Sequence, residues 1–284
     1  MADDDFDVDA WLARIAYTGP RTPDLATLAG LIAAQSAAIP FENVDVLLGR
    51  VPSLGLADLQ SKLIAGRRGG YCFELNSIFR AGLRALGFTV TGLIARVIRG
   101  QEDDAPGPAT HMTLRVDLPQ GPYLADVGFG NLTPTAPLAM VALLEQQTPH
   151  ETLRLKPWQD ELLLQVKFGT DWQNVYRLSP RPPLQVDYEM ANWLTAHHPA
   201  SPFVGTLVIA RPGPDGERRT FYNGRLTIRR PGQDPERQML TNPTFCATTL
   251  AQTFGLTLPE ADLTQALALL ETAGTTGTAH PFFT

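Results

Sequence analysis

The residue types best suited to chemistry gather around Cys72, which follows the run Arg67-Arg68-Gly69-Gly70-Tyr71. The two glycines allow a tight turn, and apolar residues at helical spacing, Leu75, Ile78 and Phe79, begin directly after the cysteine. We therefore expect Cys72 in the first turn of a helix, where unpaired backbone N–H groups and the positive end of the helix dipole favour a thiolate and can stabilise an oxyanion. Taken alone, Cys72 is equally well explained as a small buried apolar residue.

A thiolate nucleophile needs a base and an acceptor that orients the base, and His111 and Asp126 supply these residue types. Both lie in short alternating runs that predict the two strands of a hairpin. A turn centred directly after Leu118 puts His111 opposite Asp126, with β-carbons about 4.5–5.5 Å apart. A four-residue loop over 119–122 puts Arg115 opposite Asp126 instead, and both registers stay open. Each residue alone has an ordinary structural explanation, but the three together predict a Cys-His-Asp constellation.

The elements that must position these residues fall into three parts, which predict an α+β fold. Residues 1–87 are predicted as helical, residues 88–196 as mostly antiparallel strands, and residues 197–284 as a mixed part with a final helix. The predicted helical stretches cover 25–32, 75–86 and 263–270. The predicted strands cover 90–98, 111–118, 123–127, 162–168, 172–178, 206–210, 220–222 and 226–230.

Charge and cysteine content narrow the class of function. The 284 residues carry a formal net charge of -6, which disfavours nucleic-acid binding because phosphate contacts need a basic surface. The first residues are acidic rather than basic, and no apolar run approaches the roughly 20 residues of a membrane helix, so we expect no membrane association and a cytoplasmic location. Two cysteines make no disulfide framework, and we expect no metal site.

Four motifs resemble those of the arylamine N-acetyltransferases. They are Ile39-Pro40-Phe41-Glu42-Asn43, Arg68-Gly69-Gly70-Tyr71-Cys72 with Asn76, Thr110-His111, and Asp126-Val127-Gly128-Phe129-Gly130. The resemblance covers the first half of the chain well and the last third loosely. It implies a helical bundle, a β-barrel and an α/β lid on a cysteine-protease-like core. It also implies a catalytic triad of Cys72, His111 and Asp126, and a ping-pong reaction in which Cys72 takes an acetyl group from acetyl-CoA and passes it to an arylamine, arylhydroxylamine or hydrazine.

The same resemblance suggests residues for substrate binding. It implies that an acceptor pocket is lined by Phe41, Val97, Thr110, Phe129 and Phe203, and that Glu42 and Arg68 form a structural ion pair. No glycine-rich phosphate loop is present, so the basic residues of a C-terminal strand are our candidates for the CoA phosphates: Arg225, Arg229 and Arg230.

Three other functions remain compatible with these residues. An amide synthase of the same family, which closes a macrolactam, would carry the same triad. A papain-like or transglutaminase-like thiol hydrolase uses the same residue types in the same chain order. A binding module without catalysis would leave Cys72 unreactive. The physiological acceptor, the preferred acyl-CoA and the oligomeric state are not predicted.

Overall fold

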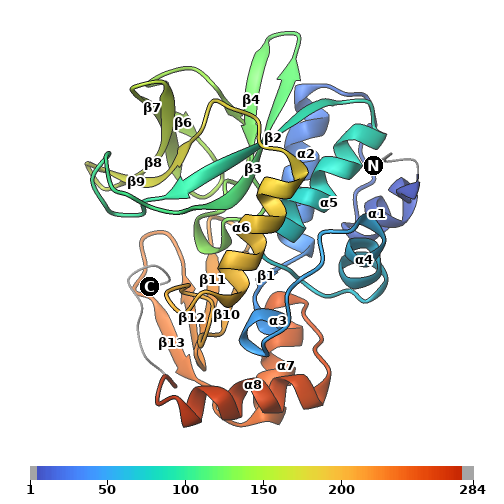
Figure 1. Ribbon diagram of the computed structural model, residues 1–284, viewed down its shortest axis with the longest axis vertical. Coiled ribbons are helices and arrows are strands. Elements are labelled where there is room, and N and C mark those ends of the chain that lie inside the picture. The colour runs from blue at the N-terminus through green and yellow to red at the C-terminus, as the bar shows by residue number, and fades with distance from the viewer. Residues whose placement is uncertain (1–4, 277–284) are drawn as a thin grey trace.

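The structure is a computed structural model that describes residues 5–276. Its N-terminal helices, a large antiparallel sheet and a C-terminal sheet with two helices occupy separate regions that meet at the centre (Figure 1). The α+β class and the order of the three parts follow the sequence prediction.

The N-terminal region packs its helices around fully buried side chains that include Trp11, Leu28, Leu31 and Phe79. Helix α2 begins after Asp24, whose carboxylate accepts a 2.8 Å hydrogen bond from the Thr27 backbone N–H. The elements are α1 (Val8–Arg14), α2 (Leu25–Ala38), β1 (Phe41–Glu42), α3 (Val44–Leu47), α4 (Leu56–Leu59), a π-helical turn (Gln60–Ala65) and α5 (Cys72–Ala85).

The central region is an eight-stranded antiparallel sheet that curls into a nearly closed barrel, in the order β5-β4-β3-β2-β9-β8-β7-β6 (Figure 1). Alternate side chains of its strands fill the interior, with Leu155, Leu164 and Tyr176 completely buried. Its strands are β2 (Thr89–Val97), β3 (Ala109–Leu118), β4 (Gly121–Ala125), β5 (Leu138–Ala139), β6 (Gln146–Gln147), β7 (Thr152–Trp158), β8 (Glu161–Phe168) and β9 (Asp171–Leu178), and a 3-10 turn covers Gly130–Leu132.

The hairpin of β3 and β4 adopts a register that the sequence analysis did not predict. Leu118 pairs with Gly121 and Leu114 with Ala125, so the loop is a two-residue turn. Continuing this register would place Asp126 opposite Thr113, and neither of the two predicted registers is correct. Because the loop is still even in length, Asp126 and His111 remain on one face, as diagonal rather than direct neighbours.

The C-terminal region is built on a five-stranded antiparallel sheet in the order β1-β10-β11-β12-β13. Strand β1 comes from the N-terminal region and pairs Phe41 with Ala210 of β10. This pairing joins the N-terminal region to the C-terminal sheet. The remaining elements are α6 (Gln185–His197), β10 (Val208–Pro212), β11 (Arg218–Tyr222), β12 (Arg225–Arg229), β13 (Glu236–Met239), α7 (Pro243–Phe254) and α8 (Glu260–Thr272). Helices α6 and α7 were not predicted from the sequence. Helix α6 crosses in front of the junction of the three regions (Figure 1).

Candidate active site

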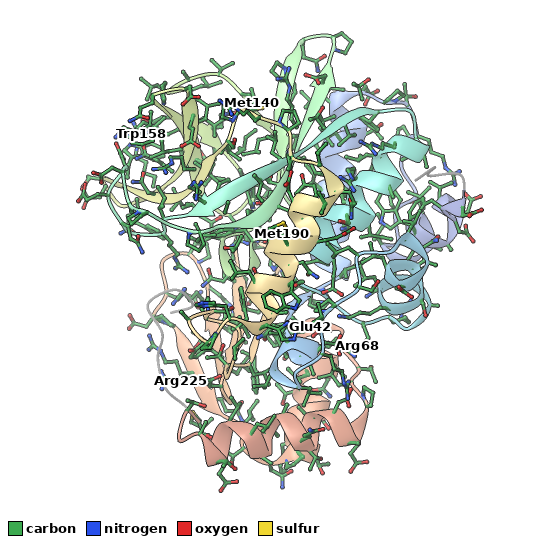
Figure 2. The ribbon with its side chains drawn as sticks, in the orientation of Figure 1. Glu42, Arg68, Met140, Trp158, Met190 and Arg225 are labelled. Carbon is green, nitrogen blue, oxygen red and sulfur yellow. The ribbon has the colours of Figure 1, made fainter. Side chains whose placement is uncertain are left out.

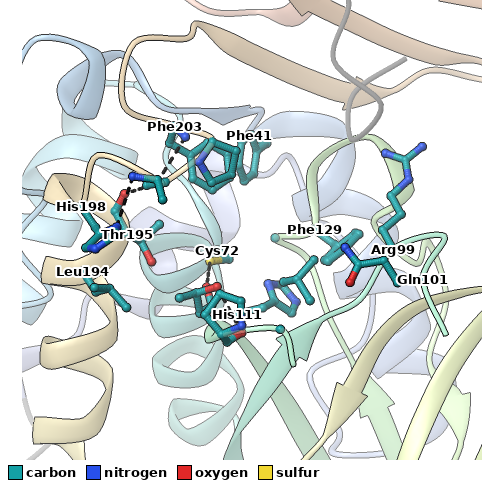
Figure 3. A pocket seen from close by; sticks show the side chains of 18 of the residues that line it. Phe41, Cys72, Arg99, Gln101, His111, Phe129, Leu194, Thr195, His198 and Phe203 are labelled. Atoms are coloured by element: carbon teal, nitrogen blue, oxygen red, sulfur yellow. Dashed lines mark hydrogen bonds between the residues drawn. The ribbon is translucent and has the colours of Figure 1, made fainter. Parts of the chain in front are cut away.

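Cys72 is the first residue of α5, as its sequence context predicts. The turn before it is held by Glu74, whose carboxylate accepts a 3.0 Å hydrogen bond from the Tyr71 backbone N–H, as in a capping box. The Cys72 side chain is nearly buried, and its sulfur lies 3.6 Å from the Thr110 carbonyl oxygen at the start of β3. The start of α5 therefore places the sulfur beside the end of the barrel strand that carries His111 (Figure 3).

His111 and Asp126 are in direct contact beside this sulfur. The Nε2 atom of His111 lies 2.6 Å from Oδ2 of Asp126, and both side chains are buried. The rings of Phe129 and Tyr176 pack against the imidazole, with centroids 4.9 Å and 5.0 Å away, and limit its rotation. The structure thus brings Cys72, His111 and Asp126 together across 54 residues of chain.

Three further donors hold the Asp126 carboxylate. Its Oδ1 accepts a 3.0 Å hydrogen bond from Asn76 Nδ2 and a 2.9 Å bond from the Gly128 backbone N–H. Its Oδ2 accepts a 3.0 Å bond from the Tyr176 hydroxyl in addition to the contact with His111. A buried carboxylate with this many donors is stabilised in its ionised form. Asn76 belongs to a predicted motif, whereas the role of Tyr176 was not predicted.

The electrostatics of the site favour a proton on His111. Burial alone would lower the pKa of His111, but the charge and hydrogen bond of Asp126, together with Cys72, outweigh it and raise that pKa to about 10. Burial would raise the pKa of Asp126, but His111, Gly128 and Asn76 lower it below its ordinary value. At neutral pH the pair is therefore an imidazolium and a carboxylate, with the sulfur of Cys72 next to the imidazolium.

Gly128 allows the close packing that this arrangement needs. A β-carbon at this position would come within 2.9 Å of the Cys72 Cα and 2.8 Å of Asn76 Nδ2. Real β-carbons do not approach backbone atoms so closely, so only glycine lets the segment after Asp126 lie against the start of α5.

A cavity of about 540 Å³ opens over Cys72. All five residues predicted for an acceptor pocket, Phe41, Val97, Thr110, Phe129 and Phe203, line it. Figure 3 shows the rings of Phe41 and Phe203 together on one side, with centroids 5.8 Å apart. The lining residues that the sequence analysis did not name as site residues include Arg99, Gln101, Pro106, Gly107, Pro108, Asn131, Leu194, Thr195, His198, Ser201 and Pro202. They come from the loop after β2, the 3-10 turn at Gly130–Leu132, the end of α6 and the segment that follows it, and no local pattern signals that these segments face Cys72.

The three arginines predicted to meet CoA phosphates are absent from the cavity lining and differ in their surroundings. Arg230 pairs with Glu217 at 2.8 Å and with Glu236 at 2.5 Å. Burial and the neighbouring charge of Arg237 lower the pKa of Arg229. Arg225 lies at the start of β12 on the C-terminal sheet (Figure 2).

Glu42 and Arg68 form the ion pair that the resemblance implied. Arg68 Nη2 lies 2.7 Å from Oε1 of Glu42, and the Glu42 side chain is fully buried. The other carboxylate oxygen of Glu42 accepts a 2.8 Å hydrogen bond from the Val44 backbone N–H. Lys62 bridges the nearby carboxylates of Asp45 and Glu74 at 2.6 Å and 2.7 Å. This charge network anchors the turn before Cys72 to the segment around β1.

Comparison with known proteins gives one consistent result. Residues 24–263 match the sequence model of a protein family described as N-acetyltransferase. The arylamine N-acetyltransferase of Escherichia coli is 41% identical over 213 residues, which is 75% of each chain. That of Mycolicibacterium smegmatis is 42% identical over 208 residues, 72% of this chain and 76% of the relative.

The chain belongs to the arylamine N-acetyltransferase family.

Solved structures of this family agree over nearly the whole chain. The Salmonella typhimurium enzyme superposes with a TM-score of 0.87 at 37% identity, covering 92% of this chain and 97% of its own. The Mycobacterium marinum enzyme in complex with CoA superposes with a TM-score of 0.86 at 38% identity, covering 92% and 98%. The predicted fold of helices, barrel-like sheet and C-terminal α/β region is thereby confirmed.

Membership in the family makes this protein an acetyltransferase with acetyl-CoA as its co-substrate. Among residues 5–276, no three or more His, Cys, Asp or Glu side chains are grouped so that they could hold a metal ion. Within the same range, no helix is both long and apolar enough to cross a membrane.

Proposed function

We propose that this arylamine N-acetyltransferase family member moves an acetyl group from acetyl-CoA to the nitrogen of an arylamine, arylhydroxylamine or hydrazine through a thioester on Cys72. The observation that carries the proposal is the contact of His111 with Asp126 beside the sulfur of Cys72, at the base of a cavity with aromatic walls. Its location would be the cytoplasm, in keeping with its acidic composition and small-molecule chemistry.

In the first half-reaction Cys72 acts as the nucleophile. Its thiolate attacks the acetyl carbonyl carbon, a new C–S bond forms, and the C–S bond to CoA breaks. His111 gives its proton to the departing CoA sulfur, and Asp126 keeps the imidazole oriented throughout. The first backbone N–H groups of a helix lack intrahelical partners, so those at the start of α5 would stabilise the developing oxyanion.

In the second half-reaction the acceptor nitrogen attacks the carbonyl carbon of acetyl-Cys72. His111, now neutral, takes a proton from that nitrogen, the amide forms, and Cys72 leaves as a thiolate. The rings of Phe41, Phe129 and Phe203 offer flat apolar surfaces for an aromatic acceptor. The protonated imidazole of the resting site is thereby restored.

We propose that one face of the C-terminal sheet binds the phosphates of CoA. Residues paired directly across strands point to the same side, and this register runs from Phe41 through Ala210, Thr220 and Thr227 to Arg237. Arg225 and Arg229 are two residues on either side of Thr227 and share that side. Because Phe41 lines the cavity, these arginines stand on the sheet face that leads to it.

Arg99, in the loop after barrel strand β2, is a further cation near this face of the sheet. Burial and the nearby charge of Arg229 lower the pKa of Arg99 to about 10, and Arg99 lines the cavity. Two half-buried guanidinium groups that repel each other would both gain from an anion between them. We therefore assign the phosphate contacts to Arg99, Arg225, Arg229 and Arg237, and leave out Arg230 because it already pairs with two carboxylates.

The test of the reaction is intact-protein mass spectrometry after mixing with acetyl-CoA. We expect a gain of one acetyl group, absent in Cys72→Ala and discharged when an arylamine is added. No adduct with any short acyl-CoA would contradict the proposal, and peptide hydrolysis without CoA would replace it by the thiol hydrolase alternative.

A further inference from the structure

We propose that Asp103 and Asn174 form a latch that holds the loop at residues 99–108 as one wall of the cavity over Cys72. The inference rests on the proposed function for its kinetic consequences and on the structure alone for its geometry. It assigns positioning roles to two residues that lie outside the cavity lining.

The loop contributes five of the 20 residues that line the cavity although it has no regular secondary structure. Arg99, Gln101, Pro106, Gly107 and Pro108 all line the cavity. Figure 3 shows Arg99 and Gln101 on the side opposite α6, with Cys72 between the two walls. An irregular segment of this length keeps one shape only where its backbone groups find partners.

Asp103 fixes the middle of the loop to the outside of the barrel. Its carboxylate accepts a 2.6 Å hydrogen bond from Lys156 Nζ on β7 and a 2.9 Å bond from Asn174 Nδ2 on β9. Its backbone carbonyl accepts a 2.6 Å bond from Arg177 Nη1, also on β9. The guanidinium of Arg177 stacks over Trp158 at 4.2 Å, which keeps that donor in place.

Asn174 fixes the first part of the loop. Its Nδ2 also donates a 2.9 Å hydrogen bond to the Gln101 carbonyl, and its own carbonyl accepts a 2.9 Å bond from the Gly100 backbone N–H. Its Oδ1 accepts a 2.8 Å bond from Gln165 Nε2, so the amide orientation is determined from both ends. Asn174 is 7% exposed, whereas the Asp103 and Lys156 side chains are 29% and 36% exposed.

The exposed fractions indicate which contact of Asp103, that with Lys156 or that with Asn174, holds the loop more strongly. An ion pair about a third exposed, such as that of Lys156 with Asp103, contributes little by itself because water screens it. The buried amide of Asn174 cannot replace lost partners with water, so breaking its contacts costs more. We therefore place the positioning role mainly in the Asp103–Asn174 contact, with Lys156 as support for the Asp103 charge.

The test exchanges the carboxylate of Asp103 and the amide of Asn174. Asn174→Asp puts a second carboxylate against Asp103 and removes the donor to the Gln101 carbonyl, so the loop should leave the barrel. We expect the KM for acetyl-CoA to rise about tenfold, equivalent to about 1.4 kcal/mol, with kcat nearly unchanged. Combining it with Asp103→Asn restores a donor and an acceptor between residues 103 and 174 in exchanged positions, and should lower the KM part of the way back, since the donor to the Gln101 carbonyl stays absent.

A second readout does not depend on the acetyl-transfer reaction. Alkylation of Cys72 by a bulky maleimide, relative to small iodoacetamide, should be faster in Asn174→Asp and return toward the wild-type ratio in the double variant. The control is Lys167→Ala, which breaks the 3.0 Å pair with Glu145 on the same sheet away from the cavity. It should change neither readout.

Two outcomes would overturn the latch. An unchanged KM and alkylation ratio in Asn174→Asp would show that the loop keeps its place without these contacts. A lower melting temperature with an unchanged alkylation ratio would leave only a structural role. If wild-type protein gives no acetyl adduct, the proposed reaction fails, but the alkylation ratio still decides the latch.

Discussion

The Tyr176 hydroxyl donates a 3.0 Å hydrogen bond to Oδ2 of Asp126, although their strands are not neighbours in the sheet. Strands β2 and β3 lie between β9, which carries Tyr176, and β4, which ends just before Asp126. The contact therefore crosses the barrel interior, and closure of the sheet brings the two residues together.

Removing this hydroxyl should slow the acetylation of Cys72. In Tyr176→Phe the aromatic ring still packs against His111, but Asp126 loses one of its donors and orients the imidazole less firmly. A hydrogen bond to a charged group contributes about 1.5–3 kcal/mol, so we expect roughly a tenfold lower single-turnover rate after partial compensation. Tyr188→Phe is the control, because its buried hydroxyl donates to the Leu93 carbonyl away from Cys72. Equal rates in both variants would contradict this role.

The acetylation rate should stay level from neutral pH up to the region of pH 10, where His111 loses its proton. Asp126→Asn removes the carboxylate charge that contributes most to raising the pKa of His111, so burial lowers that pKa from about 10 toward its ordinary range. We expect the fall in rate to move to that lower pH in the variant. Single-turnover rates across the range measure both midpoints, and coincident midpoints would exclude Asp126 as the cause.

The same proton links His111 to stability. Because the folded state binds this proton more tightly than the unfolded chain, the stabilisation is fully present below about pH 6.5 and is lost as the pH rises through about 10. The free energy of unfolding should thus fall more steeply between these values in wild type than in His111→Gln. Urea titrations at the two ends of the window give the comparison, and parallel losses would count against the pairing.

The proposed phosphate face predicts a defect confined to the nucleotide part of the donor. Arg229→Ala should raise the KM for acetyl-CoA about tenfold through loss of a charge-assisted contact. The KM for acetyl-pantetheine, which lacks the adenosine phosphates, should not change. Arg230→Ala is the matched control on the same sheet, since its guanidinium is occupied by Glu217 and Glu236. A higher KM for both acetyl-CoA and acetyl-pantetheine would indicate that Arg229 supports the fold rather than binding a phosphate.

Arg68 should matter for folding more than for chemistry. Arg68→Ala leaves the fully buried carboxylate of Glu42 without its cation, which costs about 3–5 kcal/mol of unfolding free energy. Arg21→Ala breaks an exposed pair with Asp9, with side chains 56% and 73% exposed, and should cost less than about 1 kcal/mol. Chemical denaturation measures both. An Arg68→Ala protein of normal stability that loses acetylation would refute the structural assignment.

Helix α6 shows why part of the fold escapes sequence reasoning. Its buried face carries Tyr188, Ala191, Asn192 and Thr195, which are mostly small or polar, while its exposed face includes Met190 and Trp193. The apolar pattern is therefore the reverse of that of an ordinary surface helix. Helix α7 does carry a local signal, since Asn242 caps it and Pro243 occupies its first position.

Local sequence determined the start of α5 at Cys72, because the glycines before it and the apolar period after it act within a few residues. It also determined the shared face of His111 and Asp126, because any even hairpin loop gives that result. The hairpin register depended on the tertiary structure, since packing on both sides selects among turns that the sequence permits. The contact of Tyr176 with Asp126, the pairing of Phe41 with Ala210 and the loop wall at 99–108 join residues distant along the chain. Only closure of the barrel and docking of the C-terminal sheet bring such residues into contact.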